Sequence, residues 1–116
     1  MSDYIRYTKQ LIKALTTLES IYRNDLPVER SREFFNKIKP EAEQYLVLLS
    51  DWEKQARLLT QKGVLKIFPQ QIDATVDNMK ALIMHSYYKD VRKRRYIEIK
   101  KSCYYIFTES MEELSD

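Results

Sequence analysis

The chain has 116 residues, of which 44% are apolar and 32% are charged, and its net charge is +3. This length and composition are typical of one globular domain covering residues 1–116, and they exclude a disordered chain and a two-domain protein. The single cysteine, Cys103, excludes an internal disulfide framework and a cysteine-based zinc site. One glycine and three prolines favour long helices with short connections over a β-rich fold.

The amino-terminal sequence, MSDYIRYTKQ, lacks the apolar core of a secretory signal peptide. No apolar run approaches the roughly 20 residues that cross a membrane. We therefore expect a cytoplasmic protein without a membrane segment.

The first predicted helix begins at Ser2, a good N-cap residue, and ends before Pro27. Its apolar residues recur at alternating spacings of three and four, which is typical of one buried helical face. They are Tyr4, Tyr7, Leu11, Ala14, Leu18 and Ile21.

The second predicted helix contains Pro40, a residue that normally stops a helix. Its apolar series nevertheless continues in phase on both sides of the proline: Phe35, Ile38, Ala42, Tyr45, Leu49, Trp52, Ala56 and Leu59. An unbroken phase predicts one long helix, kinked near residues 36–40. The alternative is a new helix with Pro40 in its first turn. Gly63 is the natural residue just after the end of this helix.

The third predicted helix opens at Pro69, and its apolar face contains Ile72, Val76, Met79, Leu82, Ile83 and Tyr87. The fourth starts near Asp90, and its seam contains Tyr96, Ile99, Cys103 and Ile106. Four amphipathic helices with short links predict an all-α fold, an antiparallel up-down-up-down four-helix bundle.

Several stretches in the second half of the chain resemble the YppE-like family. They are PQQIDATVDN at Pro69–Asn78, HSYY at His85–Tyr88 and RKRRY at Arg92–Tyr96. Members of that family are small cytoplasmic proteins of Bacillus-type bacteria and are classed as a domain of unknown function. The resemblance implies a four-helix bundle, but it implies no activity and no catalytic residues.

The sequence shows no pattern of residues that carries a known chemistry. A ferritin-like di-iron site needs a Glu-x-x-His pair on each of two helices, but Leu82 stands three residues before His85, the only histidine. We therefore expect no metal, no cofactor and no catalytic residue. His85 is expected to pack at the end of the bundle, with an acid–base or pH-sensing role as the alternative. Cys103 is expected to be a small buried apolar residue.

Seven basic residues lie between residues 89 and 101, where the fourth helix is expected to begin. A helix amino terminus disfavours cations, so a structural or functional reason is expected for them. Extending the core seam backward leads to Arg92, with Arg95 at its edge. These two arginines are predicted to point inward and to form structural ion pairs with carboxylates at that end of the bundle. The carboxylates are Glu19, Asp25, Glu29, Glu33, Glu41 and Glu43.

Lys93 and Arg94 are predicted to face outward, with Tyr87 and Tyr88 close by. Arginine and tyrosine are good anchors for a protein partner, so these four residues form a candidate partner surface. The sequence therefore favours a non-enzymatic protein-interaction or regulatory module, either monomeric or dimeric. Two alternatives remain open: a weak nucleic-acid-binding protein that uses residues 87–101, and an unrecognised enzyme centred on His85.

Overall fold

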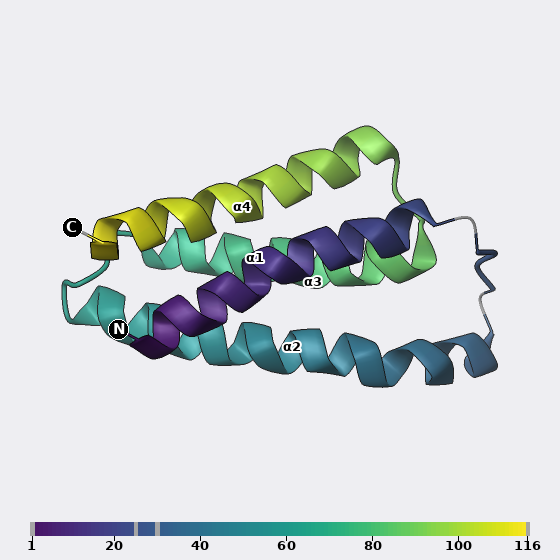
Figure 1. Cartoon of the computed structure of the whole chain (residues 1–116), viewed down its shortest axis with the longest axis horizontal. Helices are drawn as coiled ribbons and strands as arrows, with labels where there is room; N and C mark the ends of the chain where they lie inside the picture. Colours follow the sequence, from purple (N-terminus) through teal and green to yellow (C-terminus); the bar gives the residue numbers. More distant parts are fainter. Residues whose placement is uncertain (1, 25, 30, 116) are drawn as a thin grey trace.

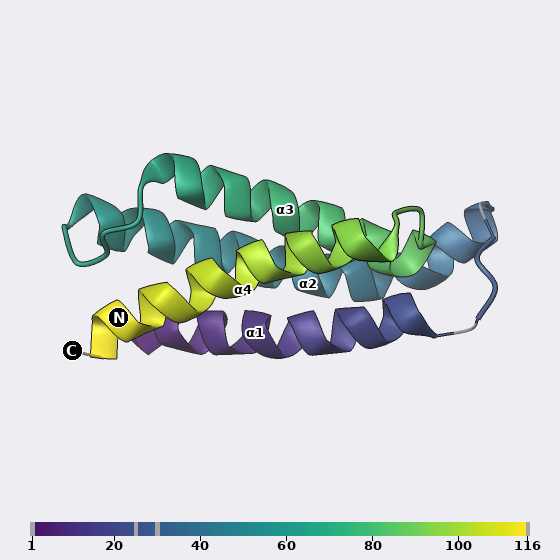
Figure 2. The same ribbon diagram turned by 90° about the horizontal axis from the view of Figure 1, so that it is seen from above.

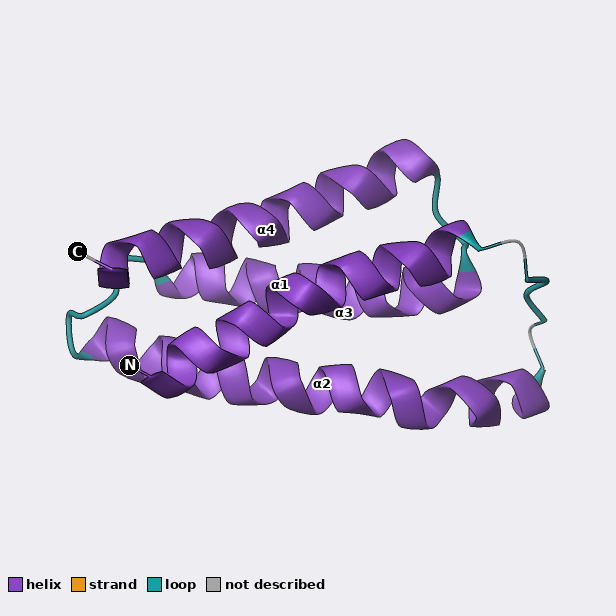
Figure 3. Cartoon of the chain, viewed as in Figure 1, coloured by secondary structure: helices purple, strands orange, loops and turns teal. Residues whose placement is uncertain are grey.

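The computed structural model of the chain describes residues 2–24, 26–29 and 31–115 and is built from helices (Figure 1). The helices are α1 (Ser2–Arg23), α2 (Arg32–Gln61), α3 (Pro69–Tyr88) and α4 (Lys93–Ser115). The described residues contain no strand (Figure 3). The predicted all-α fold with four helices is therefore confirmed.

The helices lie side by side in an elongated molecule that measures 45 × 27 × 21 Å. The α1–α2 and α3–α4 connections lie at one end, and the α2–α3 connection lies at the other (Figures 1 and 2). α1 and α3 contact each other through the middle of the molecule. α2 and α4 lie on opposite sides of this central pair (Figure 1). One face of α4 is therefore turned away from the rest of the bundle.

α2 runs from Arg32 to Gln61 without interruption at Pro40. The expectation of one long helix is therefore correct, and the alternative of a new helix at the proline is wrong. Pro40 is exposed, so its ring displaces no core side chain. The kink at this position stays a prediction.

Gly63 ends α2 in the way that the sequence predicted. Its φ of 73° is left-handed, a conformation that only glycine adopts without strain. The Gly63 N–H donates to the Thr60 carbonyl at 3.1 Å, and the Val64 N–H donates to the Leu59 carbonyl at 2.9 Å. This pair of bonds is the Schellman motif, which satisfies the last carbonyls of a helix.

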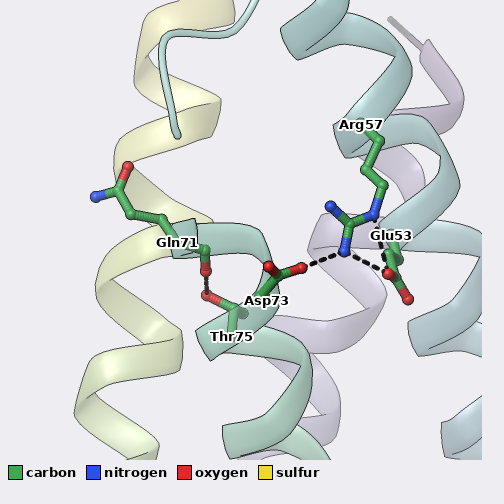
Figure 4. Close-up of polar contacts among 5 residues, drawn as sticks. All are labelled: Glu53, Arg57, Gln71, Asp73 and Thr75. Carbon is green, nitrogen blue, oxygen red and sulfur yellow. Dashed lines mark hydrogen bonds and ion pairs between the residues drawn. The ribbon is translucent and has the colours of Figure 1, made fainter. Parts of the chain in front are cut away.

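Arg57 ties the end of α2 to the start of α3 (Figure 4). Its Nη2 lies 2.7 Å from Glu53 Oε2 in its own helix and 2.5 Å from Asp73 Oδ1 in α3. In the same turn of α3, the Thr75 hydroxyl donates to the Gln71 carbonyl at 2.8 Å (Figure 4). These contacts fix the corner at which the chain reverses direction.

Trp52 is the largest fully buried side chain and joins three helices. Its indole N–H donates to Thr8 Oγ1 of α1 at 3.1 Å, and its ring meets Phe107 of α4 edge-on at 5.3 Å. Nearby, the buried Tyr4 hydroxyl of α1 donates to Ser110 Oγ of α4 at 2.7 Å. The polar atoms in this part of the core are thus paired across helices, as burial requires.

A second buried polar group joins the helices at the opposite end. Tyr96 of α4 stacks on Tyr22 of α1 with ring centres 4.0 Å apart, and its hydroxyl lies 2.7 Å from Ser86 Oγ of α3. The Tyr22 hydroxyl donates to the Val91 carbonyl at 2.6 Å. Burial raises the pKa of Tyr96 to about 12. Tyr4 near the start of α1 and Tyr22 near its end therefore contact opposite ends of α4.

Candidate functional site

α4 begins at Lys93 and not at Asp90, and this shift changes the position of Arg92. The Arg92 carbonyl accepts the Tyr96 N–H at 3.0 Å, so Arg92 is the residue that precedes the first turn. The helical seam does not extend to a residue outside the helix. Arg92 is exposed, and its predicted inward orientation is wrong.

Arg95 is also exposed, with 62% of its side chain accessible, and its ion pair at 3.9 Å is with Glu98 of the same helix. The predicted inward orientation of Arg95 is therefore wrong as well. The ion pair that joins α4 to α1 is formed by Lys100 and Glu19, with a Nζ–Oε1 distance of 2.6 Å. This bond holds the pKa of Glu19 below its usual value. Among the expected carboxylates, Asp25 lies outside the described residues.

Tyr87 lies inward, which argues against its predicted contact with a partner, whereas Tyr88 is only half-buried and its role in binding a partner stays a prediction. Tyr87 is 5% exposed, and its hydroxyl donates to Glu41 Oε2 of α2 at 2.9 Å. Burial and this carboxylate raise the pKa of Tyr87. Tyr88 is half-buried and meets the Phe34 ring edge-on at 5.6 Å. The sequence already held a signal for Tyr87, because it falls on the apolar face of its helix.

Lys93 and Arg94 do lie on the surface, and the Arg94 side chain is 93% exposed. Arg94 forms only a loose contact of 3.5 Å with Glu98. Their role in binding a partner stays a prediction.

Two neighbouring tyrosines of α4 that were not expected in the site are the most exposed aromatic residues of this helix. Tyr104 is 50% and Tyr105 is 60% exposed. A helix places residues three, four and seven apart on one face, so the two tyrosines share a face with Arg94, Lys101 and Glu112. We call these five residues the outer face of α4. The phase of the core seam could have identified them, because they occupy the opposite side of the helix.

Shallow grooves lie on both sides of this outer face. The groove between α1 and α4 has a volume of about 210 Å³, and Ile12, Ile97 and Tyr104 contribute to its lining. The groove between α3 and α4 has a volume of about 510 Å³ and includes Tyr105. Lys101 borders both grooves. A partner helix placed along α4 would therefore meet apolar, aromatic and cationic side chains together.

His85 and Cys103 lie apart from the outer face. His85 Nδ1 lies 2.6 Å from Asp90 Oδ1 at the end of α3. Cys103 is fully buried, and burial raises the pKa of its thiol to about 12. A thiol in this environment is a poor nucleophile, because the reactive form is the thiolate.

Two further properties concern metals and membranes. Among the residues that the structure describes, no group of three His, Cys, Asp or Glu side chains could hold a metal ion. Across the same residues, no helix is long and apolar enough to span a membrane.

Comparison with known proteins covers almost the whole chain. Residues 8–114 match a bacterial domain of unknown function, DUF1798. The chain belongs to the DUF1798 family. Among its relatives is the uncharacterized protein YppE of Bacillus subtilis (strain 168), which is 26% identical over 112 residues, with 96% of this chain and 91% of YppE covered. The resemblance to the YppE-like family is therefore confirmed.

Several solved structures share the fold of this chain. The crystal structure of YppE matches with a TM-score of 0.80 at 26% identity and covers 97% of this chain and 92% of YppE. The solution NMR structure of YppE has a TM-score of 0.79 at 25% identity, and the match covers 99% of this chain and 94% of YppE. The crystal structure of a Listeria innocua protein of unknown function matches with a TM-score of 0.82 at 14% identity and covers 98% of this chain and 92% of that protein. At this identity the match shows a shared fold alone.

Proposed function

We propose that this DUF1798 protein is a cytoplasmic, non-enzymatic protein-interaction or regulatory module, built as an antiparallel up-down-up-down bundle. The proposal rests on the exposed aromatic and cationic side chains of the outer face of α4. There Tyr104 and Tyr105 are at least half exposed beside Lys101. Protein-binding surfaces are enriched in tyrosine and arginine, which supply large contact areas and charged hydrogen bonds.

The surface predicted around residues 87–95 is retained only in part. Lys93 and Arg94 are exposed and accessible to a partner, whereas Tyr87 is buried and is not accessible. The candidate partner surface therefore runs from Arg94 along α4 to Tyr105. A non-enzymatic role is supported by the Cys103 thiol, which is buried in the core and cannot reach a substrate.

The experiment compares three immobilised baits in an extract of the cells that produce the protein. The first is the unmodified chain, and the second carries Tyr104→Ser and Tyr105→Ser on the outer face. The third carries Val47→Ser and Leu58→Ser, which remove exposed apolar side chains from α2 and serve as the matched control. We expect a specific protein to be retained by the first and third baits and lost from the second.

Circular dichroism establishes that all three baits are folded to the same extent. Identical sets of retained proteins on the three baits would show that the outer face of α4 does not bind a partner. Loss of the retained protein from the α2 control alone would move the binding surface to α2.

Nucleic-acid binding is the alternative function, and the exposed cations beside two exposed tyrosines favour it. Binding of a mixed-sequence oligonucleotide is measured over a salt series, because phosphate contacts weaken steeply with salt. The alternative requires salt-dependent binding that Lys93→Ala and Arg94→Ala weaken. Absence of binding at low salt would exclude nucleic-acid binding as the function.

A further inference from the structure

The charges of α4 are separated along its length. Between residues 93 and 101, five of the six charged residues are basic, and between residues 102 and 114 all three are acidic. The acidic residues are Glu109, Glu112 and Glu113. All three are exposed on the surface, and Glu113 also accepts the Lys66 N–H at 3.0 Å. The helix therefore presents a cationic half and an anionic half.

This order of charges opposes the helix dipole at both ends. Cations stand at the positive amino-terminal end, and carboxylates stand toward the negative carboxyl-terminal end. Within the bundle, the Lys100–Glu19 pair neutralises one cation of the cationic half. Arg94, Lys101 and Glu112 are exposed on the surface, and Arg94 has only its loose contact of 3.5 Å with Glu98, so these charges are accessible to a partner of opposite charge.

We propose that the outer face of α4 binds the same face of a second copy of this chain, with the two α4 helices antiparallel. The inference rests on the proposed function and names its partner. An antiparallel copy places each cationic half against the other anionic half, so the face is complementary to itself. A uniformly acidic partner would be repelled by Glu109 and Glu112, and a uniformly basic one by Arg94 and Lys101.

Sequence spacing defines the register. Arg94 and Lys101 are seven residues apart, and so are Tyr105 and Glu112. Setting Arg94 opposite Glu112 of the second copy therefore also sets Lys101 opposite Tyr105 of the second copy. The first contact is an ion pair, and the second brings a cation to an aromatic ring. Twofold symmetry produces each contact twice.

The size of the face sets the strength of the association. α4 has 23 residues and is about 34 Å long. One helix-on-helix contact of this length is at or below the low end of specific interfaces, about 1,200 Å² in total. The expected association is therefore a reversible dimer that forms at micromolar or higher concentrations and weakens with added salt.

The test is sedimentation equilibrium of the purified chain over a concentration range at low and high salt. Arg94→Glu places like charges together at both symmetric contacts, so we expect the dissociation constant of the dimer to rise about tenfold. The double variant Arg94→Glu/Glu112→Arg exchanges the two charges and should restore the dimer. Recovery of the dimer would show that Arg94 contacts Glu112 of the second copy and that the effect of Arg94→Glu is not a general effect of net charge.

Arg95→Glu is the matched control. It makes the same charge change on the neighbouring residue, which is exposed but lies off the outer face. We expect this control to dimerise like the unmodified chain. Equal effects of Arg94→Glu and Arg95→Glu, or no recovery in the double variant, would contradict the register.

A chain that stays monomeric at all concentrations overturns the inference. If such a monomer still loses a retained protein when Tyr104 and Tyr105 are changed to serine, the proposed function stands and the partner is a different protein. If neither the oligomeric state nor the retained proteins respond to changes on this face, both proposals are wrong.

Discussion

At the scale of single residues, the core depends on a few buried polar contacts. Trp52 is fully buried, and Thr8 provides the acceptor for its indole N–H. The Thr8 hydroxyl in turn donates to the Tyr4 carbonyl at 2.6 Å. The Thr8 hydroxyl therefore accepts the hydrogen bond of the buried Trp52 indole and donates its own hydrogen to a carbonyl of α1.

Thr8→Val retains the shape of the side chain but removes the acceptor. We expect the free energy of unfolding to fall by about 1–3 kcal/mol, because a buried N–H loses its hydrogen bond. Urea denaturation followed by tryptophan fluorescence measures the loss. Thr16→Val, at an exposed site in the same helix, is the control and should change stability by less than about 0.5 kcal/mol. Equal losses in the two variants would contradict the assigned role of Thr8.

At the scale of helices, α4 is joined to α1 by contacts near both of its ends. Tyr4 and Ser110 meet at one end, and Lys100 pairs with Glu19 toward the other. Glu19 also accepts a bond of 2.7 Å from Arg23 in its own helix. Because these bonds favour the carboxylate, they stabilise the folded state only while Glu19 is ionised.

Glu19→Gln should therefore destabilise the protein in a pH-dependent manner. The pKa of Glu19 is lower in the folded than in the unfolded chain, so its contribution is complete above the unfolded pKa. This contribution disappears as the pH falls through the folded pKa. We expect a loss of about 1 kcal/mol at pH 7 that shrinks as the pH falls below the unfolded pKa and disappears below the folded pKa. Urea denaturation at several pH values measures both.

Glu43→Gln is the control for this prediction. Glu43 is 58% exposed and lies 3.8 Å from Lys39 in the same helix. Such an exposed pair contributes little. A loss at pH 7 as large as that of Glu19→Gln would show that the effect is not specific to the α1–α4 contact.

Gly63→Ala tests the end of α2. The added methyl group meets no atom within 4 Å, so its cost comes from the left-handed backbone alone. We expect the melting temperature to fall, with a loss of about 1–2 kcal/mol. Lys62→Ala changes the preceding residue, whose φ of −78° is right-handed, and should be nearly neutral. Equal effects of the two alanines would contradict the role of the left-handed conformation.

The helices could be predicted because their spacing of apolar residues is a local property of the chain. The buried positions of Trp52 and Cys103 followed from the same spacing. The contacts between helices could not be predicted in this way. Lys100 reaches Glu19 because α4 packs against α1 with these two residues side by side. Arg92 is exposed because α4 begins after it. Both facts depend on the exact ends and packing of helices.

At the scale of the whole molecule, Cys103 reports on the opening of the bundle. It belongs to the buried core on α4, a helix that contacts both α1 and α3, and has no accessible surface. The pKa of its thiol, about 12, leaves very little thiolate at pH 8. A thiol reagent can therefore modify Cys103 only when α4 separates from the rest of the bundle.

We expect labelling of Cys103 to follow global unfolding. The rate should be low without urea and should rise with the urea dependence measured by fluorescence, because a single core of this size opens cooperatively. Thr8→Val, on a different helix, should accelerate labelling by roughly fivefold for each 1 kcal/mol of stability that it loses. The control is Ser102→Cys in a Cys103→Ser chain, which places the thiol at an exposed neighbouring position and should label at the rate of an unfolded peptide. Labelling of Cys103 that is rapid, or independent of urea and of Thr8→Val, would show that α4 detaches on its own, and the helix proposed to bind a second copy would then be a separately mobile element.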